Sequence, residues 1–383
     1  MSGWEKVKLG DLYSVHNGIS KGKQFFGKGY PFLSFSTVFN NWFLPLKLDS
    51  LVESTEQEQN SYSIRRGDVF ITRTSETMDE LGMSSVALND IPNATYNGFT
   101  KRLRPITNKV LPEFIGYYMR SPKFRGKFMA FSSMTTRASL SNAELLGMQI
   151  ELPCLKMQYD IATILRSYDN LIDNYCRQIK LLEEAAQRIY KEWFVDLRFP
   201  GYEHTNIVDG VPEGWEKTDI NSIMTFHRGY DLTRSNMQYG KYPVVGSTSV
   251  IGYHNKYKIH GPGIVTGRSG SLGKYQLIWE DFWPHNTSLY ISDMKGHHFL
   301  YLYGILQTVD FSVLNNGGAI PTLNRNTLSA IRVLKAPKSL QEQYVGIVEP
   351  YYNIIRDVEK EITLLTEARD RLLPKLMSGE IKV

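Results

Sequence analysis

The chain has 383 residues, of which 42% are hydrophobic and 22% charged, so it is long enough for two or three globular domains and is not typical of a disordered protein. No apolar run reaches the roughly 18 residues of a membrane helix, and the first residues lack a signal-peptide core, so we expect a cytoplasmic protein. The net charge of +5 permits binding to nucleic acid, while the two isolated cysteines, Cys154 and Cys176, argue against a disulfide scaffold or a structural zinc site.

Residues 1–153 are predicted to form a first front domain of mixed strands and helices. Gly67–Thr72 is typical of a turn followed by a β-branched strand, and residues 112–119 are expected to be helical. Arginine and hydroxyl side chains after a strand suit contacts with phosphates and base edges. The candidate DNA contacts of this domain are Lys21, Lys23, Arg73, Thr74, Ser75, Lys101, Arg102 and Arg137.

A long helix is predicted next, and we assign it to residues 154–198. Its apolar residues alternate spacings of four and three, which is the period of a coiled coil. Phe199–Gly201 is expected to end the helix and to begin a polar linker. The heptad positions are Ile161, Leu165, Tyr168, Ile172, Tyr175, Ile179, Leu182, Ala186, Ile189 and Trp193.

Residues 199–337 are predicted to contain the linker and a second front domain. Gly263–Thr266 is expected to be a strand that corresponds to the one before residue 73, and residues 297–306 are expected to be helical. A polar loop again follows the strand. The candidate DNA contacts here are Arg228, Ser247, Thr248, Arg268, Ser269, Lys274, Asn315 and Asn316.

A second heptad helix is predicted in residues 338–383, and only Arg369 interrupts its apolar stripe. Pro350 is expected to kink this helix or to mark its true start, and Pro374 with Ser378–Gly379 is expected to stop it. Its heptad positions are Tyr344, Val348, Tyr351, Ile355, Val358, Ile362, Leu365, Leu372 and Leu376.

Each apolar stripe has to be buried, and the simplest solution packs the two helices against each other. An antiparallel pair is favoured because a whole front domain separates them in sequence. Forty helical residues span about 60 Å. The predicted helix interface consists of Ile172, Tyr175, Ile179, Leu182, Ile189, Trp193, Ile355, Val358, Ile362, Leu365 and Leu372.

The chain also repeats itself, with a pseudo-two-fold internal duplication. Gly3–Lys6 recurs 211 residues later as Gly214–Lys217, and the helical regions match at an offset of 183 residues. His16 and Gly18 recur as His227 and Gly229, and the two histidines are either structural or in contact with DNA. The front domains differ in most residues, which fits either two unlike reading surfaces on one frame or a duplication that drifted.

Common catalytic signatures are missing from the sequence. Gly267, Gly270 and Gly273 are spaced like a phosphate loop but lack the Gly-Lys-Ser/Thr of a nucleotide-binding site, and no Gly-x-Ser-x-Gly elbow occurs. The adjacent pair His297 and His298 would point to different sides of an element, which disfavours a shared metal ion. No Pro-Pro pair is present, so the adenine methyltransferase motif is absent.

The residues just described resemble those of the specificity subunits of type I restriction-modification systems. Gly3–Asp11 is similar to the start of a target-recognition domain, as is its second copy at Gly214. Residues 181–196 resemble the central conserved region of this family, and residues 369–381 resemble its C-terminal conserved region. The likeness extends over essentially the whole chain.

The resemblance implies an α+β fold with two target-recognition domains joined by two antiparallel coiled-coil helices. Each domain would read one half of a split double-stranded DNA target, and the helices would set the spacer. Two modification subunits would supply S-adenosylmethionine-dependent adenine methylation, and two restriction subunits would add ATP- and Mg-dependent translocation and cleavage. The chain itself would bind no cofactor or metal and would catalyse no reaction.

Two other functions stay open on the sequence. A self-contained enzyme that acts on nucleic acid would transfer methyl groups to DNA without partners. A protein-interaction scaffold built on the coiled coil would show no sequence preference in a DNA pull-down.

Overall fold

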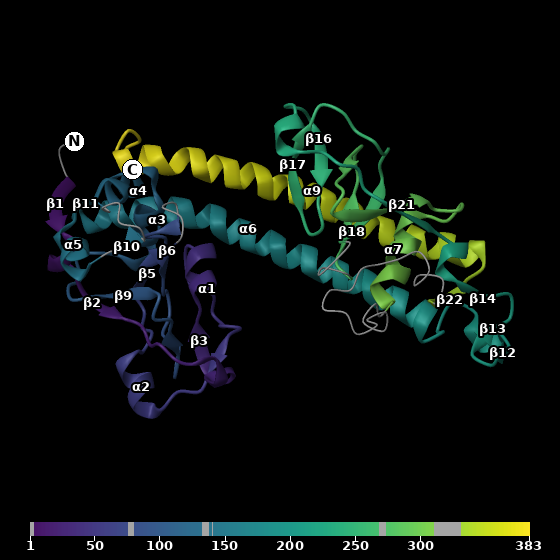
Figure 1. Ribbon diagram of the computed structural model, residues 1–383, viewed down its shortest axis with the longest axis horizontal. Coiled ribbons are helices and arrows are strands. Elements are labelled where there is room, and N and C mark those ends of the chain that lie inside the picture. The colour runs from purple at the N-terminus through teal and green to yellow at the C-terminus, as the bar shows by residue number, and fades with distance from the viewer. Residues whose placement is uncertain (1–3, 76–79, 132–137, 140, 268–272, 310–330) are drawn as a thin grey trace. The chain divides into compact units, whose positions relative to one another are not determined.

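The computed structural model describes residues 4–75, 80–131, 138–139, 141–267, 273–309 and 331–383. The chain divides into two compact units. Unit 1 holds residues 1–175 and 360–383, and unit 2 holds residues 176–359. The long helices α6 (Leu155–Tyr190) and α9 (Lys338–Ser378) each contribute one part to unit 1 and the other to unit 2 (Figure 1). The units therefore cut across the helices, whereas the sequence suggested separate front and helix segments.

Unit 1 combines three main sheets with short helices. A two-stranded antiparallel sheet joins β1 to β11, a four-stranded sheet has the order β2-β9-β5-β7, and a three-stranded sheet has the order β4-β3-β8. The strands are β1 (Trp4–Lys8), β2 (Tyr13–Asn17), β3 (Phe26–Leu33), β4 (Leu51–Val52), β5 (Val69–Thr72), β6 (Thr74–Ser75), β7 (Ser84–Val86), β8 (Thr95–Tyr96), β9 (Thr100–Pro105), β10 (Ala138–Ser139) and β11 (Gln149–Pro153).

The short helices of unit 1 begin where local chemistry favours a helix start. Capping boxes at Thr55 and Ser141 satisfy the first backbone N–H groups of α2 and α5, and Pro112 occupies the first turn of α3. These helices are α1 (Phe35–Asn40), α2 (Glu56–Ser61), α3 (Pro112–Arg120), α4 (Pro122–Phe131) and α5 (Asn142–Gly147).

Unit 2 repeats this sheet plan. It has a two-stranded sheet β14-β22, a four-stranded sheet β15-β21-β18-β19 and a three-stranded sheet β17-β16-β20, together with the small hairpin β12-β13. Its elements are β12 (Ile207–Val208), β13 (Val211–Pro212), β14 (Glu216–Asp219), β15 (Thr225–Arg228), β16 (Tyr242–Val245), β17 (Val250–His254), β18 (Gly263–Gly267), β19 (Tyr275–Ile278), β20 (Trp283–Pro284), β21 (Ser288–Asp293), α7 (Phe299–Thr308) and β22 (Arg332–Lys335).

The two-, four- and three-stranded sheets just named in unit 1 each have a counterpart in unit 2, which confirms the duplication inferred from the repeated residues. In each four-stranded sheet the strand that comes first in the sequence pairs with the one that comes last: β2 with β9, and β15 with β21. All pairings within these two sheets are antiparallel. In each three-stranded sheet one pairing is parallel, between β3 and β8 in unit 1 and between β16 and β20 in unit 2. The predicted strands at residues 67–72 and 263–266 are β5 and β18, and the predicted helices at 112–119 and 297–306 are α3 and α7.

Each unit uses one part of both long helices as a wall of its hydrophobic core. In unit 1, Leu165 of α6 and Leu376 of α9 are buried with α3. In unit 2, Ala186 of α6 and Tyr344 and Val348 of α9 are buried with α7. Where the helices enter these two cores, the heptad stripe is thus covered both by the other helix and by the sheet-containing part of the same unit.

Within unit 2 the helices run antiparallel, as predicted. The aromatic rings of Tyr190 and Tyr344 have centroids 5.5 Å apart. Further along, Glu183 of α6 interacts electrostatically with Glu359 of α9. Residue numbers therefore rise along one helix and fall along the other.

The predicted interface residues differ in burial. Ile355 and Val358 are buried, whereas the others are half-buried: Leu372 against the core of unit 1, Ile179, Leu182, Ile189 and Trp193 against the core of unit 2, and Ile172, Tyr175, Ile362 and Leu365 outside both cores.

Pro350 does not mark the start of the second helix, so this part of the prediction was wrong. Helix α9 begins at Lys338 and continues through Pro350 and also through Pro374 to Ser378. Pro350 and Gly346 are both exposed, so water can bind the carbonyl oxygen of Gly346 that the missing proline N–H leaves free. The stop follows at Gly379, which has a left-handed φ of 72°.

Candidate nucleic-acid interface

Four segments of unit 1 converge at one end of its sheets. We call them loop cluster 1: residues 17–23, 33–36, 73 and 97–100. Their backbones are tied together by hydrogen bonds from Gly18 N to Thr100 O (3.2 Å), Ile19 N to Tyr96 O (2.9 Å), Gly98 N to Ile19 O (2.8 Å), Asn97 N to Leu33 O (3.0 Å) and Arg73 N to Phe99 O (2.9 Å).

Unit 2 holds an equivalent arrangement, which we call loop cluster 2: residues 228–232, 245–249 and 285–288. Matching backbone bonds join Gly229 N to Ser288 O (3.0 Å), Tyr230 N to Pro284 O (2.8 Å) and His285 N to Val245 O (2.9 Å). These three bonds match those made by Gly18, Ile19 and Asn97 in loop cluster 1, so the two clusters share this part of the frame, although the side chains on it differ.

The repeated glycines lie at the closest point of this frame. A Cβ atom on Gly18 would lie 2.1 Å from the carbonyl oxygen of Asn97, and one on Gly229 would lie 2.0 Å from that of His285. Neither position has room for a side chain unless the backbone shifts. The repeat of a glycine at an offset of 211 residues therefore reflects a shared backbone contact.

The basic residues of loop cluster 1 are unequally available. Lys21 donates to the carboxylate of Glu58 (2.7 Å) and to the carbonyl oxygen of Glu53 (2.6 Å), and its side chain is 13% exposed. The hydrogen bond from Lys21 is also the main reason why the pKa of Glu58 is lowered. Lys23 is exposed and forms no ion pair with any described residue, while Arg73 is half-buried.

Lys101 and Arg102 are not surface residues, contrary to our expectation. Each is 4% exposed on β9, a strand flanked by two others. Lys101 donates to Asn142, and Arg102 donates to the carbonyl oxygen of Ser63 (2.7 Å) and lies over the ring of Tyr96. Burial lowers the pKa of both basic groups. These two side chains stabilise the packing of unit 1. We therefore remove both from the candidate DNA contacts.

Thr74 and Ser75 form β6, which pairs with β10 through the backbone. Arg137, Arg268, Ser269, Asn315 and Asn316 lie outside the described residues.

The candidate residues of unit 2 lie in loop cluster 2 or near it. Arg228 is exposed, and its Nε donates to the carbonyl oxygen of Asn286 (3.3 Å). Ser247 donates to the carbonyl oxygen of Thr287 (2.7 Å), and Thr248 is exposed in the same turn. Lys274 is exposed just before β19. The structure thus brings Arg228, Ser247 and Thr248 together.

Sequence reasoning missed Arg234. It begins a 3-10 turn, Arg234–Asn236, just as Lys23 begins the turn Lys23–Phe25, and both basic side chains are exposed. The two residues are 211 apart, so applying the repeat offset to Lys23 would have found Arg234. His16 and His227 are exposed on the equivalent strands β2 and β15, and both interpretations of their role stay open.

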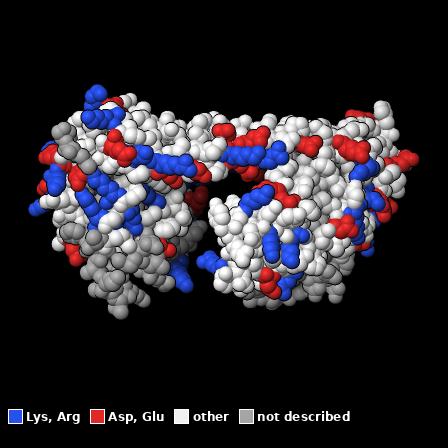
Figure 2. Space-filling view, turned by 90° about the horizontal axis from the view of Figure 1, so that it is seen from above, with Lys and Arg blue, Asp and Glu red and all other residues white. Residues whose placement is uncertain are grey.

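On the face seen in Figure 2, charge is distributed differently over the two units. In Figure 2, basic side chains gather into a group on unit 1 with few acidic ones between them, whereas basic and acidic side chains are interspersed over unit 2. Such basic surface suits the phosphate backbone of a nucleic acid.

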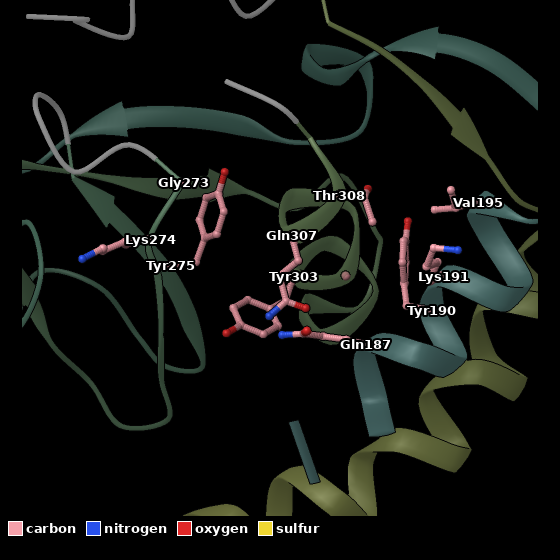
Figure 3. A pocket seen from close by; sticks show the side chains of 11 residues that line it. Gln187, Tyr190, Lys191, Val195, Gly273, Lys274, Tyr275, Tyr303, Gln307 and Thr308 are labelled. Atoms are coloured by element: carbon pink, nitrogen blue, oxygen red, sulfur yellow. The ribbon is translucent and has the colours of Figure 1, made fainter. Parts of the chain in front are cut away.

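Unit 2 also contains a pocket of about 700 Å³ between the end of α6, α7 and the start of β19 (Figure 3). Tyr190, Tyr303 and Gln307 are among its lining side chains, with Lys191 and Lys274 at its edge. None of the described residues that line it is a cysteine, a histidine or a carboxylate, so they provide no set of metal ligands.

In the part of the chain that the structure describes, no group of three or more His, Cys, Asp or Glu side chains is placed to hold a metal ion. Among the same residues, no helix combines the length and apolar character needed to cross a membrane.

Comparison with known proteins gives one consistent result. The family model for the type I restriction modification DNA specificity domain matches residues 1–184 and again residues 212–366. The two matches begin 211 residues apart, which is the offset of the internal repeat.

Two curated relatives, both type I restriction enzyme specificity subunits, match the chain over nearly their whole length. The chain is 22% identical to the type I restriction enzyme MjaIX specificity subunit of Methanocaldococcus jannaschii, covering 99% of this chain and 94% of that protein. It is 24% identical to the HindI specificity subunit of Haemophilus influenzae, covering 100% of both.

A solved structure shares the fold. The S subunit of a type I restriction-modification system from M. genitalium aligns with a TM-score of 0.57 at 16% identity, over 97% of this chain and 96% of that one. With a family model that matches both halves and relatives that match from end to end, the chain belongs to the family of type I restriction-modification DNA specificity subunits.

Proposed function

We propose that the chain reads a bipartite DNA target for a type I restriction-modification complex, with one half-site bound by each unit. The observation that carries this proposal is the pair of loop clusters, in which one hydrogen-bonded backbone frame presents two unlike sets of side chains. A common frame with unlike surfaces suits one docking mode on two different sequences.

Exposed cations in loop cluster 1 and next to loop cluster 2 would provide sequence-independent affinity. Lys23 and Arg234 occupy equivalent turns and would contact phosphates next to each half-site. Each neutralised phosphate contributes about −0.9 to the slope of log K against log salt concentration, so removing both cations lowers the magnitude of that slope by about 2.

We further propose that α6 and α9 set the spacer and dock two modification subunits. Support comes from the antiparallel pairing within unit 2 and from the anchoring of both helices in the core of each unit. Exposed apolar side chains on the helices, such as Leu181 (65% exposed) and Leu364 (59% exposed), suit protein contacts.

In this proposal the chemistry belongs to the partners. The modification subunits would bring S-adenosylmethionine and flip the adenine to be methylated, and two restriction subunits would bring ATP and Mg. The chain itself would be noncatalytic, because its sequence lacks the motifs of these activities. Its proposed place is the cytoplasm, together with those subunits.

The direct test is methylation sequencing of a random DNA library with the assembled modification complex. A bipartite target with two unlike half-sites and a fixed spacer is expected. Methyl transfer by the purified chain without partners would refute the noncatalytic role, and a continuous target would refute the division between units.

The spacer role has its own test. Removing one heptad from each helix, residues 172–178 and 360–366, keeps the apolar stripes in register and shortens each helix by about 10.5 Å. The accepted spacer should shorten by roughly three base pairs while both half-sites stay the same, since ten base pairs span about 34 Å. An unchanged spacer would contradict the proposal.

A further inference from the structure

We propose that two matched turns determine base choice: Asn97–Thr100 in unit 1, acting through Phe99, and His285–Ser288 in unit 2, acting through Thr287. The inference rests on the proposed function and narrows each half-site's specificity to one exposed position in each loop cluster.

The two turns share the same hydrogen bonds from their fourth residue to the carbonyl oxygen of their first. In unit 1, Thr100 donates to the carbonyl oxygen of Asn97 through its N–H (3.0 Å) and its hydroxyl (2.7 Å). In unit 2, Ser288 donates to the carbonyl oxygen of His285 through its N–H (2.9 Å) and its hydroxyl (2.8 Å). Thr100 and Ser288 are both fully buried, so the last residue of each turn anchors it to the interior of its unit.

Each turn is also fixed through its first residue. The side-chain oxygen of Asn97 accepts from the N–H of Phe99 (2.6 Å), and Nδ1 of His285 lies 3.0 Å from the hydroxyl of Thr287. The close approach at Gly18 in unit 1, and its counterpart in unit 2, hold the same residue from the other side. Rigid backing of this kind lowers the ordering cost of binding, because the backbone of the turn is already fixed.

What differs between the turns is the chemistry that they present to solvent. Phe99 is 62% exposed and offers an apolar ring, whereas the exposed Thr287 offers a hydroxyl group. The residue before it is glycine in unit 1 and the amide Asn286 in unit 2. A single exposed phenylalanine is ordinary on a protein surface. Unit 2 has an equivalent turn with the polar residue Thr287 at the same position. This difference between two equivalent turns is what points to base recognition.

The two kinds of side chain would select different bases. A phenylalanine ring packs against a thymine methyl group or wedges between base steps, whereas threonine and asparagine side chains form hydrogen bonds to base edges. Cations lie next to both turns: the backbone N–H of Arg73 bonds to Phe99 O (2.9 Å), and the guanidinium of Arg228 bonds to Asn286 O (3.3 Å). Each turn is therefore placed to meet a base edge close to a phosphate contact.

The experiment uses the chain assembled with its modification subunits and a random DNA library read by methylation sequencing. Phe99→Thr and Phe99→Leu should change the preferred base at one or more positions of one half-site by roughly tenfold or more and leave the other half-site as it was. Thr287→Phe should change the preferred base in the other half-site and leave the half-site affected by the Phe99 variants as it was. Thermal unfolding midpoints should not move, because both side chains are exposed.

Two controls lie at the far ends of the same strands. Ile106 is 60% exposed directly after β9, and Ser292 is exposed near the end of β21, so Ile106→Thr and Ser292→Phe make similar changes away from the loop clusters. Both variants should keep the wild-type target.

The possible failures are distinguishable. A wild-type complex that recognises no bipartite target removes the proposed function itself. A wild-type complex with a bipartite target that Phe99 and Thr287 variants leave unchanged overturns the inference alone. Equal loss of methylation on all sequences, with an unchanged unfolding midpoint, also overturns it, because the turns would then supply affinity without base choice.

Discussion

Arg369 is the charged residue that interrupts the heptad stripe of α9, and its removal should strongly destabilise unit 1. Its guanidinium lies 2.6 Å from the carboxylate of Asp169 on α6, and the two side chains are only 14% and 15% exposed. It also stacks over Trp42, 4.8 Å from the ring centroid. Asp169 accepts a second hydrogen bond, from the hydroxyl of Tyr117. The arginine is therefore the buried cation of a small polar network between the helices.

The expected magnitude follows from these contacts. Removing one partner of a buried ion pair costs about 3–5 kcal/mol, and the slight exposure here favours the lower end. Loss of the contact with Trp42 adds about 0.5–1 kcal/mol. We therefore expect Arg369→Ala to lower the free energy of unfolding of unit 1 by about 3–4 kcal/mol. Replacing the whole network, with Arg369→Met, Asp169→Leu and Tyr117→Phe, should stay within about 1 kcal/mol of the wild type, because no polar group is left buried alone.

Urea unfolding of the full chain, followed by tryptophan fluorescence, measures this effect. Arg371→Ala is the matched control, since Arg371 lies two residues away and pairs with Glu367 at the surface, where the side chains are 80% and 53% exposed. That pair should contribute less than about 0.5 kcal/mol. If Arg369→Ala and Arg371→Ala unfold within about 1 kcal/mol of each other, the network does not stabilise the helix pair as reasoned here.

Three more changes test other parts of the fold. Gln158 is fully buried and its amide group bonds to three backbone groups at 2.9 Å, so Gln158→Leu should cost about 3 kcal/mol or more in urea unfolding, and a cost below 1 kcal/mol would contradict this. Gly18→Ala should cost about 1–3 kcal/mol because its Cβ meets Asn97 O, while Gly126→Ala in α4, with nothing within 4 Å, should be neutral or slightly stabilising; equal effects would argue against the close contact. Hydrogen bonds from two lysines lower the pKa of Glu151 from its ordinary 4.5 to about 2, so its stabilising effect is complete above pH 4.5 and is lost as the pH falls toward 2. The difference in urea midpoint between the wild type and Glu151→Gln should shrink over that window, and a difference that grows on acidification would refute the assignment.

Much of the fold could be predicted because its signals are local or periodic. The alternation of four and three along residues 161–193 requires only a helix with one apolar face, and α6 covers that stretch up to a π-helical turn at Lys191–Val195. The repeat offset likewise predicted two similar units before any contact was known. Pro350 misled us, because a local rule about proline does not say whether water can reach the carbonyl that is left unpaired.

The candidate site was harder to predict, because burial depends on partners far away in the chain. Lys101 and Arg102 look like surface cations in sequence, yet Asn142 and the backbone at Ser63, about 40 residues from them, supply acceptors that let both be buried. Phe99 gave no sequence signal at all. Only the backbone bonds of its turn show that this exposed ring has a counterpart in the other unit.

The amino-acid sequence by itself determined the helical periods, the duplication and the family, since each depends on residue types at fixed separations along the chain. The tertiary structure decided which cations remain available and which turns face solvent, because both depend on hydrogen bonds between segments that are distant in sequence. Affinity for a partner is set by groups that the fold leaves unsatisfied and exposed, and these are known only once its internal hydrogen bonds have been assigned.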